Sequence, residues 1–170
     1  MSATLPSQPD GRDLKVAVLV TRWYPGIVAA LSAAAQATLK EAGVEADDIV
    51  VIEVPGAYEL PQAACWLARA EDVDAIVALG CIVRGETPHF DHVTRAAVDG
   101  LLQVALESGV PIGMGIITAD TMEQAEARST DAGSAGGTGV KGGNKGREAA
   151  DAALRMAATY RALEARRRLA

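Results

Sequence analysis

The sequence predicts an α/β protein, a three-layer α/β/α sandwich around a four-stranded parallel sheet. Four short aliphatic runs are spaced along the chain, at residues 14–20, 49–54, 74–79 and 110–118. Each run is almost continuously apolar rather than alternating, which is typical of strands buried on both faces between helix layers. The composition agrees, because 49% of the residues are hydrophobic and only 4% are aromatic. Such a composition indicates helices packed closely on an aliphatic sheet.

The segments between these runs carry helical periodicity. Apolar residues recur at spacings of three and four within residues 27–39, and Gly43 follows as a stop signal. Further helices are predicted at residues 59–70, 91–108, 121–128 and 144–168. Trp66 lies among Ala and Leu in the second helix and is interpreted as a core residue. Tyr160 of the last helix is expected to face inward.

The 170-residue chain is long enough for one domain with a substantial core and too short to suggest two. We expect this domain to span residues 14–170. Residues 1–13 are expected to be a flexible N-terminal segment, or an edge strand on a neighbouring subunit. Residues 129–143 are dominated by Gly, Ser, Ala and Thr, and this low apolar content predicts an exposed, mobile loop.

Charge and cysteine content argue against several classes of function. A net charge of −6 disfavours a nucleic-acid surface spread over the domain. No apolar run approaches the ~20 residues that span a bilayer, and residues 1–11 are polar rather than a charged and then apolar signal. Cys65 and Cys81 lack the spacing of a disulfide framework or zinc site. We therefore expect a cytoplasmic protein without membrane or nucleic-acid partners.

The segment at the end of the third predicted strand carries the most chemistry. It reads Gly80-Cys81-Ile82-Val83-Arg84-Gly85-Glu86-Thr87-Pro88-His89-Phe90-Asp91 and leads into a predicted helix. Backbone N–H groups at a helix start suit an anion, Gly85 lets a ligand approach the backbone, and a histidine such as His89 titrates near neutral pH. The segment thus combines a phosphate cradle with a proton carrier. An ordinary strand-to-helix turn is the alternative.

Two further turns at strand ends offer binding groups. The second predicted strand ends in Val54-Pro55-Gly56-Ala57-Tyr58-Glu59-Leu60-Pro61, which could hold the hydroxyls of a polyol or simply start a helix. Trp23, after the first strand, could stack on a planar heterocycle or cover the core. His92 is interpreted as a packed or solvated helix residue, because His-x-x-His lacks the i, i+4 spacing of the helical zinc motif.

The segment Gly142-Gly143-Asn144-Lys145-Gly146 is only superficially similar to a phosphate loop. The spacing G-x-x-x-x-G-K-S/T is absent, and no strand directly precedes the segment. The dinucleotide-binding fingerprint is also missing after the first predicted strand. Nucleotide hydrolysis and a nicotinamide cofactor are therefore not indicated.

Taken together, residues 54–61, 78–91 and 143–146 resemble the motifs of the lumazine synthase family, in the same order along the chain. The resemblance covers roughly residues 14–160 and implies a flavodoxin-like sheet. It also implies a transferase of riboflavin biosynthesis, which condenses 5-amino-6-(D-ribitylamino)uracil with 3,4-dihydroxy-2-butanone 4-phosphate. The product is 6,7-dimethyl-8-ribityllumazine, with release of phosphate and water and with no metal or organic cofactor.

The resemblance also implies roles for individual residues. It implies that His89 is the proton-transfer residue. It places substrate contacts on Trp23, Ala57, Tyr58, Glu59, Cys81, Ile82, Val83 and Met114. It places phosphate contacts on Gly85, Glu86, Thr87 and Arg128, the last of these from an adjacent subunit.

Two features depart from the family pattern. Met114 stands where the family often has Phe or Asn, and the segment between Arg128 and Asn144 is longer than the family's turn. In the family this turn lies near contacts between pentamers, and insertions in it accompany free pentamers rather than sixty-subunit shells. We therefore expect a homopentamer with active sites between neighbouring subunits. A capsid is the alternative, if the longer segment is only a surface loop.

Two other functions remain open at this point. The chain could be a non-catalytic relative that binds lumazine or flavin or forms a shell, or it could resemble the archaeal type of riboflavin synthase. The presence of His89, Arg128 and the phosphate turn favours the lumazine-forming enzyme.

Overall fold

A four-stranded, all-parallel sheet forms the centre of the molecule. The computed structural model describes residues 9–70, 72–131 and 143–168. The strands follow the order β2-β1-β3-β4, which is the flavodoxin-like order. Their bounds are β1 (Val16–Thr21), β2 (Ile49–Val54), β3 (Ala75–Val83) and β4 (Ile112–Ala119). The predicted fold class is thereby confirmed. Residues 1–8 of the predicted N-terminal segment and residues 132–142 of the predicted loop lie outside the described residues.

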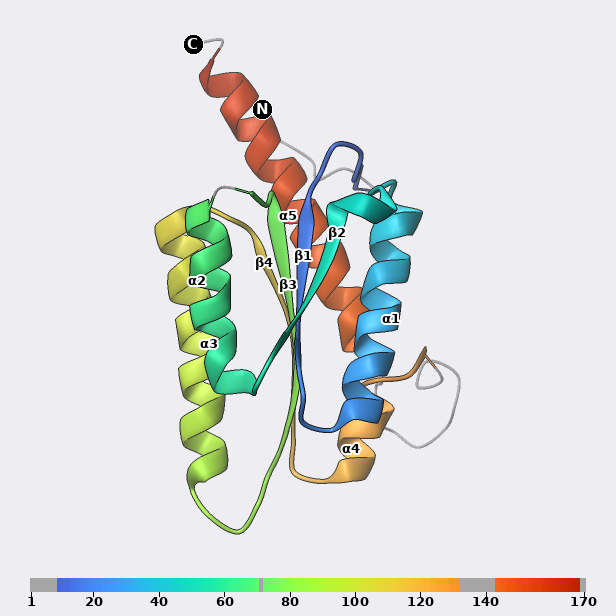
Figure 1. Cartoon of the computed structure of the whole chain (residues 1–170), viewed down its shortest axis with the longest axis vertical. Coiled ribbons are helices and arrows are strands. Elements are labelled where there is room, and N and C mark those ends of the chain that lie inside the picture. The colour runs from blue at the N-terminus through green and yellow to red at the C-terminus, as the bar shows by residue number, and fades with distance from the viewer. Residues whose placement is uncertain (1–8, 71, 132–142, 169–170) are drawn as a thin grey trace.

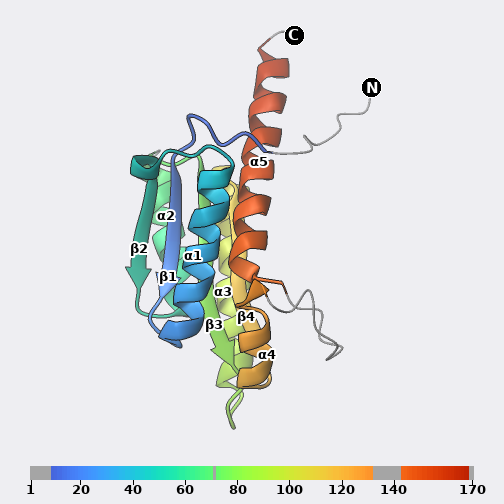
Figure 2. The ribbon, with the colours of Figure 1, turned by 90° about the vertical axis from the view of Figure 1, so that its right-hand side faces the viewer.

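Helices cover both faces of the sheet, as Figures 1 and 2 show. One face carries α1 (Pro25–Glu41) and α5 (Lys145–Arg167), and the other carries α2 (Leu60–Ala70) and α3 (His89–Ser108). The short helix α4 (Met122–Ala127) follows β4. Two single turns of 3-10 helix complete the described elements, η1 (Ala46–Asp48) and η2 (Ala57–Glu59). Gly43 has φ 95, a left-handed conformation that ends α1 as predicted.

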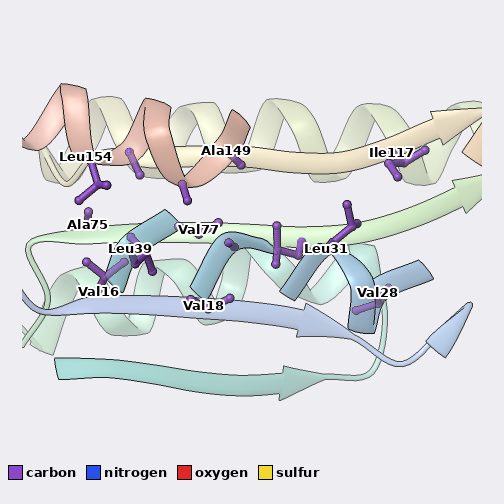
Figure 3. Close-up of a cluster of buried hydrophobic side chains, with 14 of the residues drawn as sticks. Val16, Val18, Val28, Leu31, Leu39, Ala75, Val77, Ile117, Ala149 and Leu154 are labelled. Carbon is purple, nitrogen blue, oxygen red and sulfur yellow. The ribbon is translucent and has the colours of Figure 1, made fainter. Parts of the chain in front are cut away.

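The core is divided by the sheet into two apolar layers. Because successive residues of a strand point to opposite faces, Val16 and Val18 of β1 pack toward α1 and α5, whereas Ala17 and Leu19 pack toward α2 and α3. Figure 3 shows the first of these layers, with Leu31 among the strand side chains. Each fully buried aliphatic side chain of this kind stabilises the fold by about 1.5–3 kcal/mol.

Three expectations from the sequence need correction. Strand β3 continues to Val83, four residues beyond the predicted end at residue 79, because residues 80–83 pair with residues 116–119 of β4. Trp66 is not a core residue, since it is 62% exposed on α2. Tyr160 is 51% exposed, because α5 continues past the end of the sheet (Figure 1).

Residues 143–146 of the segment that was compared with a phosphate loop form the capped start of α5. The Asn144 side-chain oxygen accepts hydrogen bonds from the backbone N–H groups of Gly146 at 2.9 Å and Arg147 at 3.4 Å, while its amide donates to the Ser129 carbonyl at 2.6 Å. Gly146 lets the helix approach α1, because a Cβ on it would lie 2.0 Å from the Leu31 carbonyl oxygen. The motif therefore joins two helices.

We predict that Gly146→Ala lowers the free energy of unfolding by about 2 kcal/mol or more, because the added methyl group overpacks the contact with α1. Urea denaturation followed by circular dichroism measures the change. Gly26→Ala is the matched control, since Gly26 also lies in the first turn of a helix and a Cβ there meets nothing within 4 Å. Equal stability of the two variants would contradict this account of the motif.

Candidate functional site

The turns that follow the strands lie together at one edge of the sheet, at the lower end of the molecule in Figure 1. This follows from the parallel pairing, in which Thr21 at the end of β1 stands beside Val54 at the end of β2. Open α/β sheets bind ligands at this edge. The turns after β1, β2 and β3 carry most of the residues singled out from the sequence.

A pocket of about 290 Å³, here called the β3 pocket, lies beside the end of β3. Trp23 from the β1 turn and His89 from the start of α3 both line it. The other lining residues are Tyr24, Cys81, Ile82, Val83, Gly85, Thr87, Phe90 and Val93. Apolar walls with a few polar groups are typical of small-molecule sites.

A second pocket of about 440 Å³, here called the β2 pocket, adjoins the first. Trp23, His89 and Val93 line both pockets, so the two form one continuous site. The β2 pocket adds Gly56, Tyr58, Glu59 and His92. His92 is exposed, as expected for a solvated helix residue.

Trp23 is held over the turn that follows β2. The indole is 68% exposed, yet a Cβ on Gly56 would lie 3.6 Å from its Cδ1 and Nε1 atoms and 3.2 Å from Oε2 of Glu59. The absence of a side chain at Gly56 therefore leaves room for the indole and the Glu59 carboxylate together. A planar ring and a hydrogen-bond acceptor are thus presented side by side.

Cys81 gives the β3 pocket a neutral wall. Its side chain is only 4% exposed, and burial raises the pKa of the thiol to about 11, because burial disfavours the charged thiolate. At neutral pH the group is therefore a protonated thiol, which packs as a small apolar side chain rather than acting as a nucleophile.

Four of the predicted site residues line neither pocket within the described chain. Ala57 is buried in η2, and Glu86 is exposed on the turn after β3. Met114 is half-exposed on β4. Arg128 caps the C-terminus of α4, where its Nη1 donates to the Gln124 carbonyl oxygen at 2.8 Å.

Five lining residues were not among the predicted site residues: Tyr24, Gly56, Phe90, His92 and Val93. Tyr24 adopts a left-handed backbone conformation with φ 55, which is uncommon for a residue other than Gly and places it directly after Trp23. Phe90 and Val93 follow His89 at spacings of one and four. The four-residue spacing on a helix brings Val93 to the His89 side, and this signal was available from the sequence.

Among residues 9–70, 72–131 and 143–168, none of the helices has the length and apolar character of a transmembrane span. Within the same residues, no group of three or more His, Cys, Asp or Glu side chains could hold a metal ion.

Comparison with known proteins gives one consistent family. The family model described as 6,7-dimethyl-8-ribityllumazine synthase matches residues 13–161. The protein of that name from Porphyromonas gingivalis is 44% identical over 155 residues, which cover 91% of each chain. The protein of that name from Salinibacter ruber is 43% identical over 150 residues, covering 88% of this chain and 90% of the relative.

We predict that iodoacetamide at pH 8 labels Cys65 well before Cys81. A thiol with a pKa near 11 is ionised in about one molecule in a thousand at that pH, and Cys81 is buried whereas Cys65 is half-buried. Labelling of Cys81 should rise as the pH approaches 11, since ionisation increases. Peptide mass spectrometry reads both residues in one sample, with Cys65 as the internal control. Preferential labelling of Cys81 at pH 8 would contradict the neutral wall.

Proposed function

The chain belongs to the 6,7-dimethyl-8-ribityllumazine synthase family, and we propose that its active site is the continuous pair of pockets around Trp23 and His89. The enzyme condenses 5-amino-6-(D-ribitylamino)uracil with 3,4-dihydroxy-2-butanone 4-phosphate in riboflavin biosynthesis. Phosphate and water are released. The observation that carries the assignment of the site is that an exposed indole and an imidazole, supplied by different strand ends, line the same two pockets.

The β3 pocket would hold the pyrimidine ring. Its side is formed by residues 81–83 of β3, whose backbone groups can bond the polar edge of a heterocycle, and Trp23 offers an aromatic face for stacking. The neutral thiol of Cys81 adds no charge that would oppose an uncharged ring.

The β2 pocket would hold the ribityl chain. The Glu59 carboxylate can accept hydrogen bonds from two hydroxyls, and Tyr58 lines the same pocket. Ala57, which is buried, would contribute its backbone rather than its side chain. A polyol needs several such groups because each hydroxyl that leaves water must find a partner.

The turn between β3 and α3 would hold the phosphate. Gly85 and Thr87 line the β3 pocket, with Glu86 between them, and the twenty-residue helix α3 begins two residues later. The partial positive charge of a helix N-terminus favours an anion. His89, the first residue of that helix, is then placed beside the leaving phosphate.

His89 would assist the proton transfers of the reaction. Imine formation, phosphate elimination, tautomerisation and ring closure each move a proton, and one imidazole within reach can assist several of these steps. The remaining acceleration would come from holding two reactive molecules in register. Proton transfer by His89 would therefore add to an acceleration that already comes from positioning the two substrates.

We predict that the protein forms a fluorescent lumazine from the two substrates and that His89→Gln lowers kcat by about a hundredfold without abolishing it, as for a general acid-base group. Lumazine fluorescence measures both results. His92→Gln is the comparison variant: His92 lies one turn further along α3 and lines only the β2 pocket, so its loss should lower kcat much less than loss of His89. The proposed function fails if the unaltered protein forms no product, and the assisting role of His89 fails if a folded His89→Gln enzyme is completely inactive.

Neighbouring chains would complete each site. Among the fourteen described residues that line the two pockets, none is Lys or Arg, although a phosphate group favours a cationic partner. Arg128 and Met114 line neither pocket of their own chain. We therefore propose that an adjacent subunit supplies both residues.

The surface supports association of several copies. An apolar groove of about 500 Å³ lies between β2 and α2, beside the exposed Trp66. Strand β2 is an edge strand with Val50 and Val51 half-exposed. An unpaired edge beside apolar surface is a site for protein contacts. We propose a homopentamer in the cytoplasm, with residues 14–170 as its domain.

We predict that light scattering gives a mass about five times the 17.5 kDa of the chain, because closed cyclic assemblies bury such surfaces in every copy. Trp66→Glu should shift the mass toward that of single chains, since a charge in the groove would be desolvated by contact. Leu163→Glu on the exposed end of α5 is the control for an added surface charge. A mass near sixty chains would exclude the free pentamer.

A further inference from the structure

Arg84 is the first residue after β3 and contacts two other parts of the chain, the start of α3 and the end of β4. Its Nε donates to Oδ1 of Asp120 at 2.8 Å, and its two terminal nitrogens donate to the two carboxylate oxygens of Asp91, each at 3.2 Å. The guanidinium carbon lies 4.1 Å from the centre of the Phe90 ring. The Arg84 backbone N–H donates to the Ala119 carbonyl oxygen at 2.9 Å.

These partners surround the turn assigned to the phosphate. Phe90 and Asp91 directly follow His89 in the first turn of α3, and Asp120 directly follows β4. One guanidinium therefore ties the end of β3 both to the start of α3 and to the end of β4. Only a planar fork with several donors can make these contacts together.

The turn between Arg84 and His89 has little support of its own. Residues 84–89 are all exposed, and a Cβ on Gly85 would meet nothing within 4 Å. Within the described chain, residues 85–87 make no hydrogen bond to another residue. The conformation of this turn is thus defined at its two ends, and Arg84 connects both ends.

We propose that Arg84 is a positioning residue, which fixes the phosphate turn and the ring of His89 for catalysis without touching the substrate. This inference rests on the proposed function of the turn. Its contribution to overall stability is small, because the Arg84 side chain is 43% exposed and ion pairs at the surface contribute little. Its contribution to geometry is larger, since a displacement of about 1 Å can cost up to a hundredfold in rate.

The same contacts extend to Arg128. The Asp120 backbone N–H donates to Oε1 of Gln124 at 3.0 Å, and the Gln124 carbonyl oxygen accepts from Arg128 at 2.8 Å. Arg84 thus holds the proton carrier of its own site and, through α4, the residue that would reach the phosphate of the next site. The two carboxylates then have separable effects, Asp91 on His89 and Asp120 on Arg128.

Steady-state kinetics of Arg84→Gln test the proposal. We expect kcat to fall about tenfold to a hundredfold and KM for the butanone phosphate to rise about tenfold, because positioning of reacting groups is lost. KM for the ribitylaminouracil should stay within about twofold, since Trp23 and Glu59 are held by other contacts. Asp91→Asn should mainly lower kcat, and Asp120→Asn should mainly raise KM for the phosphate substrate.

Two control variants separate positioning from charge. Arg84→Lys keeps the charge but cannot make the forked contact to Asp91 together with the contact to Asp120, so it should restore only a small part of the lost activity. Arg167→Gln removes an exposed ion pair with Glu164 at the far end of α5, and should leave both KM values and kcat unchanged.

Hydrogen exchange gives a readout that needs no substrate. In Arg84→Gln the amides of residues 85–87 and 89–91 should exchange faster, whereas those of residues 97–108 in the same helix should not change. The proposal is overturned if Arg84→Gln has the kinetics of the unaltered enzyme, or if exchange at residues 85–87 and 89–91 is unchanged. It is also overturned if both KM values rise equally and exchange becomes faster throughout the chain. Failure of the unaltered protein to form lumazine would instead remove the proposed function.

Discussion

All four strands run in the same direction, and the rest of the structure depends on this constraint. Parallel strands need crossover helices, which cover both faces of the sheet and bury the strands completely. The same constraint delivers the turns after β1, β2 and β3 to one edge. Trp23, Glu59 and His89 therefore line one pocket although they come from three separate turns along the chain. No local motif could assemble this set of groups.

Small residues make the layers close enough for this arrangement. Gly146 lies against the Leu31 carbonyl oxygen of α1. Gly113 of β4 lies equally close to α5, because a Cβ on Gly113 would be 2.0 Å from the Ala149 carbonyl oxygen. A chain with few aromatics can pack its helices this tightly on the sheet. Both tryptophans are exposed at the surface, where Trp23 lines both pockets and Trp66 borders the groove beside β2.

The features that depend on neighbouring residues along the chain were predicted correctly from the sequence. Aliphatic runs located all four strands, and the Gly43 stop was correct, because hydrophobic periodicity and left-handed glycines act locally. The predictions were wrong or incomplete for features that depend on a partner far away in the sequence. The end of β3 is set by pairing with β4, and Arg84 acquires its role from Asp120, 36 residues away. Trp66 was misplaced because periodicity identifies an apolar face but not whether the same chain covers it.

Electrostatics explains why the site would need a second chain. The phosphate turn lies beside two carboxylates, Glu86 on the turn and Asp91 in the first turn of α3, which repel an anion. The nearby cation, Arg84, is already bonded to Asp91 and Asp120, and both contacts raise its pKa and keep it charged. Its charge is therefore largely neutralised before a substrate arrives. A dianionic phosphate in this turn would require an additional cation, and in the proposed assembly Arg128 of a neighbouring subunit would meet that requirement without disturbing the contacts of Arg84 with Asp91 and Asp120.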